Sequence, residues 1–158
     1  MMTAIAILSL TVTPVIAGGG NLYESQLEYG RKRIPAGWVL VNYIEGGISI
    51  QFNTLNTPWS IIETHVEVAE TMEEIPQAKG NPIPGQFTYS NTHDPMVKVF
   101  TYEIMVEGEQ FYIAAHAVIY NECTGKYETA WGQGPNVFEF PGKNWAVGFT
   151  FPDPVPTD

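Results

Sequence analysis

Short runs of alternating apolar and polar residues follow one another along most of the chain. The clearest run is 48–53, in which Ile48, Ile50 and Phe52 would share one face of an extended strand. A period of two is typical of half-buried β-strands. Glycine-containing turns separate several runs, and glycine permits the positive φ that a tight hairpin needs. These turns are Glu45-Gly46-Gly47, Glu107-Gly108-Glu109 and Asn121-Glu122-Cys123-Thr124-Gly125. We therefore expect antiparallel β-sheets.

The pattern predicts about eight strands in all. They cover residues 38–44, 48–53, 59–68, 98–106, 110–120, 127–131 and 144–151, and residues 21–29 form a first strand or an arm. The three strands between 98 and 131 are expected to form a meander. Short strands joined by short turns favour two packed sheets, an antiparallel β-sandwich, and a closed β-barrel is the alternative.

Residues 70–95 connect the two halves of the pattern. The acidic stretch at 69–75 has room for one or two helical turns, and residues 76–95 are predicted to form a long loop with a short strand at 86–89. Within this loop, Ser90-Asn91-Thr92-His93-Asp94 is expected to be a turn, because Ser, Asn and Asp side chains bond to nearby backbone. Neighbours in sequence rarely form a catalytic triad, because its roles need convergent side chains from separate elements.

Residues 1–17 resemble a secretory signal peptide. They contain an apolar stretch followed by the small residues Val15 and Ala17, although no basic residue comes first. The stretch is too short for a membrane span, and Pro14 interrupts it. We expect a leader at 1–17, an arm or first strand at 18–33, a β-sandwich domain at 34–151 and a Pro/Asp-rich tail at 152–158. The mature protein is then secreted or held at the cell surface.

Charge and cysteine content narrow the range of partners. The chain has 17 acidic and 7 basic residues and a formal net charge of −10. This excess repels phosphate backbones and anionic lipids, so nucleic acid is not an expected partner. Cys123 is the single cysteine, which rules out an internal disulfide and a multi-cysteine zinc site. It falls in a predicted turn, where we expect a solvated thiol without a role.

The scarce histidines offer one candidate centre. Glu63 and His65 are two residues apart on one predicted strand and so share a face. His116 lies on another strand among alanines, and adjacency of the two strands would bring the three side chains together. Two imidazoles and a carboxylate could hold zinc or another divalent metal. The alternative is a buried hydrogen-bond network in which the carboxylate fixes the imidazole tautomers.

The last third of the chain offers a second candidate, a ligand face formed by Glu128, Trp131 and Trp145. Exposed aromatic rings on a sandwich can stack on sugar rings or anchor a partner protein. Tryptophans in an all-β protein lie more often in the core. No P-loop, dinucleotide fingerprint, nucleophile elbow, His-Glu-x-x-His or EF-hand pattern occurs in the sequence.

Five segments together resemble an uncharacterised family of secreted, all-β surface domains. They fall within residues 34–151 and read Glu63-Thr64-His65-Val66, Lys79-Gly80-Asn81-Pro82-Ile83-Pro84-Gly85-Gln86-Phe87, Ile113-Ala114-Ala115-His116-Ala117-Val118, Glu128-Thr129-Ala130-Trp131-Gly132 and Phe140-Pro141-Gly142-Lys143-Asn144-Trp145-Ala146. The resemblance implies an extracellular setting and a sheet fold, and it supplies no catalytic residue.

Three functions stay open at this point. The sequence favours a non-enzymatic extracellular domain for surface structure, self-assembly or protein interaction, with strand exchange through residues 18–30 as one version. The second is a carbohydrate or small-ligand binding module. The third is a metal-dependent enzyme centred on Glu63, His65 and His116, which comes last because no spacing marks a nucleophile or a base.

Overall fold

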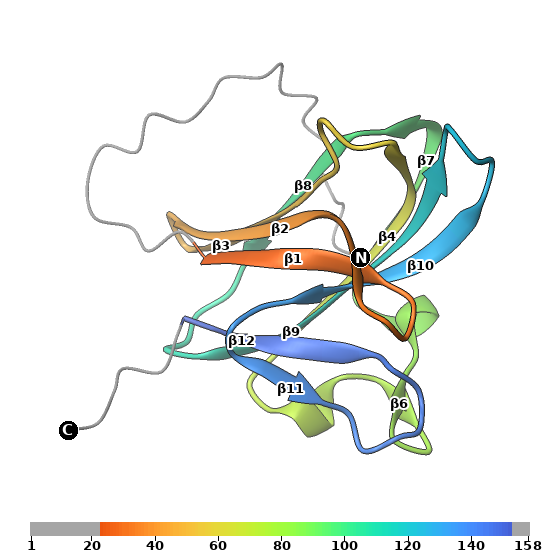
Figure 1. Ribbon diagram of the computed structural model, residues 1–158. Coiled ribbons are helices and arrows are strands. Elements are labelled where there is room, and N and C mark those ends of the chain that lie inside the picture. The colour runs from red at the N-terminus through yellow and green to blue at the C-terminus, as the bar shows by residue number, and fades with distance from the viewer. Residues whose placement is uncertain (1–22, 153–158) are drawn as a thin grey trace.

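The computed structural model describes residues 23–152, and these form an all-β fold with two short 3-10 helices (Figure 1). The strands are β1 (Tyr23–Tyr29), β2 (Ile34–Ile44), β3 (Gly47–Asn53), β4 (Trp59–Ala69), β5 (Gln77–Ala78), β6 (Asn81–Pro82), β7 (Tyr89–Val97), β8 (Val99–Met105), β9 (Phe111–Asn121), β10 (Tyr127–Gln133), β11 (Val137–Glu139) and β12 (Val147–Phe151). The 3-10 helices are η1 (Met72–Glu74) and η2 (Pro84–Gln86). None of the described helices is long and apolar enough to cross a membrane.

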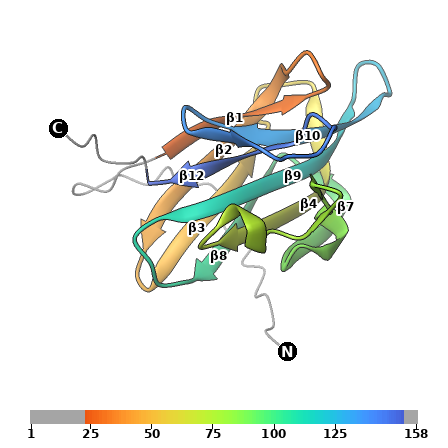
Figure 2. The same cartoon turned by 90° about the horizontal axis from the view of Figure 1, so that it is seen from below.

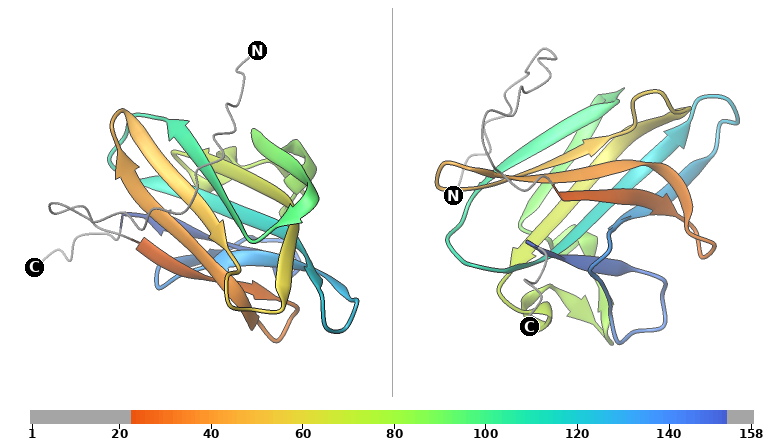
Figure 3. Two further views of the ribbon diagram at one scale, coloured as in Figure 1. Left: turned by 90° about the horizontal axis from the view of Figure 1, so that it is seen from above. Right: turned by 60° about the vertical axis from the view of Figure 1, so that its left-hand side comes forward.

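Ten of the described strands belong to one antiparallel sheet that curls until it nearly closes. Its path runs β8-β3-β2-β1-β10-β9-β4-β7, and β12 pairs with the first part of β9 and carries β11 on its outer edge. The curl is visible along the strands in the two further views (Figure 3). The prediction of an antiparallel all-β fold is confirmed, and the nearly closed barrel was the stated alternative to two separate sheets.

Several predicted strands appear where the alternating pattern places them. β2 and β3 form the hairpin around Gly46, which has the positive φ (+78°) expected at that turn. β9 and β10 form the hairpin around Gly125, and η1 lies in the acidic stretch. Residues 23–29 are the first strand of the sheet, paired on one side with β2 and on the other with β10.

Three local predictions are wrong. The short strand expected at 86–89 does not form, because η2 ends at Gln86 and β7 begins only at Tyr89. Residues 107–109 do not close a hairpin, because the two strands that flank them do not pair with each other. β8 pairs with β3, whereas β9 pairs with β4, β10 and β12, so β8 is not part of a meander. Ser90–Asp94 is not a turn but lies inside β7, which pairs with β4 through registers such as Ser90 with His65. Its polar composition fits a strand at the end of the sheet, where one side faces water.

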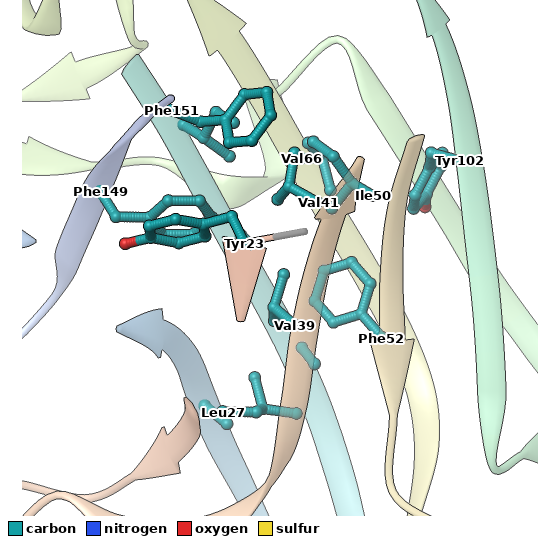
Figure 4. Packing of buried hydrophobic residues seen from close by; sticks show 14 of the residues in the cluster. Tyr23, Leu27, Val39, Val41, Ile50, Phe52, Val66, Tyr102, Phe149 and Phe151 are labelled. Atoms are coloured by element: carbon teal, nitrogen blue, oxygen red, sulfur yellow. The ribbon is translucent and has the colours of Figure 1, made fainter. Parts of the chain in front are cut away.

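The inside of the curled sheet holds the main core. Inward-facing side chains from β1, β2, β3, β4, β9 and β12 meet there, and Leu27, Val39, Ile50, Phe52 and Phe149 are fully buried (Figure 4). The Tyr23 ring stacks on Phe149 with ring centroids 5.1 Å apart. Burial of these apolar side chains contributes about 1.5–3 kcal/mol each, so this core is the main source of stability.

Polar side chains bridge the seam between the two ends of the sheet. Tyr102 of β8 places its hydroxyl 2.7 Å from Oγ1 of Thr64 on β4 and 3.2 Å from Nδ2 of Asn91 on β7. Oγ1 of Thr64 also lies 2.9 Å from Nε2 of His93, which is buried. Side-chain hydrogen bonds therefore join β8 to β4 and β7.

A second, smaller hydrophobic cluster lies outside the barrel. Its buried members include Ile75, Phe87, Ala114, Trp131 and Val147, which come from the 70–88 connection, β9, β10 and β12. The connection with η1 and η2 lies against the outer face of the sheet in the view from below (Figure 2). Residues predicted as a loop thus cover part of the barrel wall.

Candidate ligand groove and histidine row

A groove runs over the outer face of β1, β2 and β10. Cross-strand pairing places Gln133 of β10, Gln26 of β1 and Trp38 of β2 side by side in one row. Side chains at directly paired positions project to the same face of a sheet, so the two amides and the indole form one strip. The groove has a volume of about 310 Å³ and is lined by Glu24, Gln26, Glu28, Trp38, Gln133, Gly134 and Pro135.

Trp38 is the aromatic side chain of this groove and is 44% exposed. It lies on β2 between the buried neighbours Gly37 and Val39, so it is an outward position in the alternation of the strand. A large exposed ring over a hollow is a surface on which an apolar ligand face can stack. The amides of Gln26 and Gln133 offer both hydrogen-bond donors and acceptors beside it.

Glu28 is the unusual member of the groove because its carboxylate is buried. The residue is 8% exposed, and its Oε2 atom has no hydrogen-bond partner. Burial raises the pKa of Glu28, and the positive charge of Arg33 opposes the rise. A buried carboxylate oxygen without a donor costs free energy, and a donor from a bound molecule would relieve that cost.

A row of polar side chains crosses a different part of the outer face, over β7, β4 and β9. His65 pairs directly with Ser90 on one side and with His116 on the other. The Nε2 atom of His65 lies 3.3 Å from Oε2 of Glu63, and its Nδ1 atom lies 3.1 Å from Oγ of Ser90. Because a carboxylate only accepts, Nε2 carries the proton of neutral His65 and Nδ1 accepts from the Ser90 hydroxyl.

His116 is the buried end of this row, 7% exposed, with an Nδ1 atom that lacks a hydrogen-bond partner. Its ring centroid lies 5.5 Å from that of His65 and 4.7 Å from that of Trp131. Burial, with a smaller contribution from His65, lowers the pKa of His116 to about 3. His116 is therefore neutral at physiological pH.

The structure brings Glu63, His65 and His116 together: Glu63 and His65 share a hydrogen bond, and the His116 ring lies beside that of His65 without a hydrogen bond to either residue. Both ring nitrogens of His65 already have protein partners. Within residues 23–152, no group of three or more His, Cys, Asp or Glu side chains is arranged to hold a metal ion. Metal binding by these residues remains a prediction, which metal analysis of the purified protein can test.

The predicted ligand face of Glu128, Trp131 and Trp145 is not assembled as one exposed surface. Trp131 is 5% exposed and belongs to the second hydrophobic cluster, where Phe87 packs against its ring at a centroid distance of 6.3 Å. Trp145 is partly buried against the same cluster. Glu128 is an odd number of residues from Trp131 on β10, so it points to the opposite face.

One hint of the groove is visible in the sequence, because Trp38 is a large aromatic side chain at the start of a predicted strand. The cross-strand row remained hidden, because Gln26, Trp38 and Gln133 lie on three strands whose registers depend on tertiary pairing. Comparison of the chain with protein-family models, with curated proteins and with solved structures finds no match.

Proposed function

We propose that this protein is a non-enzymatic extracellular domain that recognises a saccharide through the groove over β1, β2 and β10. The observation that carries the proposal is the exposed indole of Trp38 beside a hollow lined by amides and carboxylates. Sugars present an apolar face of C–H groups edged by hydroxyls, and this combination matches an aromatic platform flanked by hydrogen-bonding side chains. The leader-like segment at 1–17, outside the described residues, supports an extracellular setting.

The open shape of the groove favours weak binding. One exposed ring and a few polar groups on a sheet face exclude little water, so we expect a Kd on the order of 1 mM for a short oligosaccharide, which corresponds to about −4 kcal/mol. Useful affinity for a surface polymer would then come from several contacts at once, because linked sites raise the effective concentration.

Assembly by strand exchange has less support in the described part of the chain. Residues 23–29 of the predicted arm form β1, which has hydrogen-bonded neighbours on both edges. Donation of this strand to another subunit would require the sheet to open between β2 and β10. Residues 18–22 lie outside the described residues, and protein interaction remains an alternative use of the same outer face.

The direct test is isothermal titration of purified mature protein with a panel of neutral and amine-bearing oligosaccharides. We expect millimolar binding to at least one, and loss of at least tenfold in affinity on Trp38→Ala, since about 1.4 kcal/mol corresponds to a factor of ten. Tyr127→Ala is the matched control, because Tyr127 is 66% exposed and does not line the groove. Absence of binding across the panel, or equal loss in both variants, would refute the proposal.

A metal-dependent enzyme centred on Glu63, His65 and His116 is tested separately. Protein purified without a chelator is analysed for zinc, iron and copper. Stoichiometric metal that disappears in His65→Gln would show that these side chains bind metal in spite of their hydrogen bonds. We expect substoichiometric metal, because both nitrogens of His65 are occupied.

A further inference from the structure

We propose that the groove selects a saccharide with a free amino group, whose ammonium pairs with the buried carboxylate of Glu28. This inference rests on the proposed function and names its ligand class. An amino sugar carries both parts that the groove can contact, a ring for Trp38 and a cation for Glu28. The amino group would lie at the β1 side of the stacked ring.

The first support is the unmet hydrogen-bonding capacity of Glu28. Glu28 lines the groove, and its Oε2 atom is buried and accepts no hydrogen bond from the described residues, so a ligand reaches this oxygen only when the side chain turns toward the groove. An ammonium group supplies three donors and a full positive charge. Charge-assisted hydrogen bonds are roughly twice as strong as neutral ones, so an amine satisfies this oxygen better than a sugar hydroxyl does.

The second support is the charge of the groove as a whole. Its lining includes two carboxylates, Glu24 and Glu28, and contains no Lys or Arg among the residues that form it. Arg33 is the basic side chain whose charge acts on Glu28, and its guanidinium lies 3.6 Å from the Glu139 carboxylate. With a formal charge of −10 on the chain, an anionic sugar is repelled and a cationic one is attracted.

The third support is Trp38 itself. An indole attracts a cation near its face through the ring quadrupole, and tryptophan is the strongest of the aromatic side chains in this respect. Trp38 is in direct register with Gln26, which is two residues from both Glu24 and Glu28 on the same face of β1. The ring and both carboxylates therefore border the same hollow.

The experiment compares two ligands of equal length and linkage, a β-1,4-linked pentamer of glucosamine and its fully N-acetylated form. Acetylation removes the charge and leaves the sugar rings in place. Titration calorimetry near pH 6 and physiological salt is expected to give at least tenfold tighter binding of the free-amine pentamer. In Glu28→Gln this preference should fall to less than about threefold, while Trp38→Ala should weaken both ligands.

Two further variants separate a specific contact from general attraction. Glu109→Gln removes the same charge from an exposed residue outside the groove and should keep the full preference. Glu24→Gln changes an exposed position of the groove and should reduce the preference for the free-amine pentamer in part. This variant replaces Glu28→Gln in the test if Glu28→Gln does not fold. Melting curves establish that each variant is folded.

The outcomes distinguish this inference from the proposed function. Equal affinity for the two pentamers would overturn the amine selectivity and leave saccharide binding standing. If Glu109→Gln and the groove variants lose the preference for the free-amine pentamer equally, that preference comes from nonspecific charge attraction. This result would overturn the inference that Glu28 selects the amine. Failure of both pentamers and of the wider panel to bind would overturn both proposals.

Discussion

Replacement of His116 by glutamine should flatten the dependence of stability on acid pH. In the folded protein the pKa of His116 is about 3, against about 6.5 in the unfolded chain. Between these values the unfolded chain binds a proton that the folded protein does not bind. Stability from neutral His116 is therefore complete above pH 6.5 and decreases as the pH falls toward 3.

The size of this effect follows from the pH interval between the folded and unfolded pKa values of His116. Each pH unit well inside it costs about 1.4 kcal/mol, so lowering the pH from 7.5 to 4.5 should cost the wild type roughly 2.7 kcal/mol through His116 alone. Carboxylates add their own dependence below pH 5 in wild type and variant alike. Subtraction of the two profiles isolates the histidine.

The assay is urea unfolding followed by tryptophan fluorescence at pH 7.5, 6.5, 5.5 and 4.5. His116→Gln is expected to be less stable than wild type at pH 7.5, because the ring packed against Trp131 is lost. The difference should shrink or reverse by pH 4.5. Parallel profiles over the whole range would refute the reasoning, and so would an NMR titration in which the His116 ring protonates near pH 6.

Three further predictions concern other parts of the fold. Thr64→Val should lower the free energy of unfolding by about 1–3 kcal/mol, because it removes the hydroxyl beside Nε2 of buried His93. An unchanged urea midpoint would contradict this prediction. Gly47→Ala should destabilise by about 1–3 kcal/mol, because an added Cβ would clash with the carbonyl oxygen of Ile104, and a melting temperature equal to wild type would argue against that packing. Cys123 is exposed, so one thiol per native chain should react with Ellman's reagent within minutes, whereas reaction only in denaturant would show that it is covered.

Local patterns in the sequence predicted local elements well. The alternation at 48–53 and the glycines at 46–47 lead to the β2–β3 hairpin, whose two strands are close in sequence and need little else to pair. The convergence of His65 and His116 also followed from the pattern once β4 and β9 are adjacent. The hairpin needs only the information in one turn, whereas the histidine pair also depends on the long-range pairing and register of β4 with β9.

Long-range pairing could not be derived in the same way. The turn at 107–109 has the composition of a hairpin, yet β8 and β9 pair elsewhere because each finds partners in other parts of the sheet. Polar residues at 90–94 resemble a turn, and only the available edge of β4 makes them a strand. Burial of Trp131 likewise depends on the 70–88 connection folding over β10.

The measurement closest to the central claim is an NMR titration of isotope-labelled protein with the free-amine pentamer, followed through backbone and side-chain amide signals. We predict that the shifts concentrate on Gln26, Trp38 and Gln133 and on the backbone around Glu28, with little change at His93 across the barrel. Shifts clustered on the Glu63–His65–His116 row, or none at millimolar ligand, would contradict the assignment of the groove.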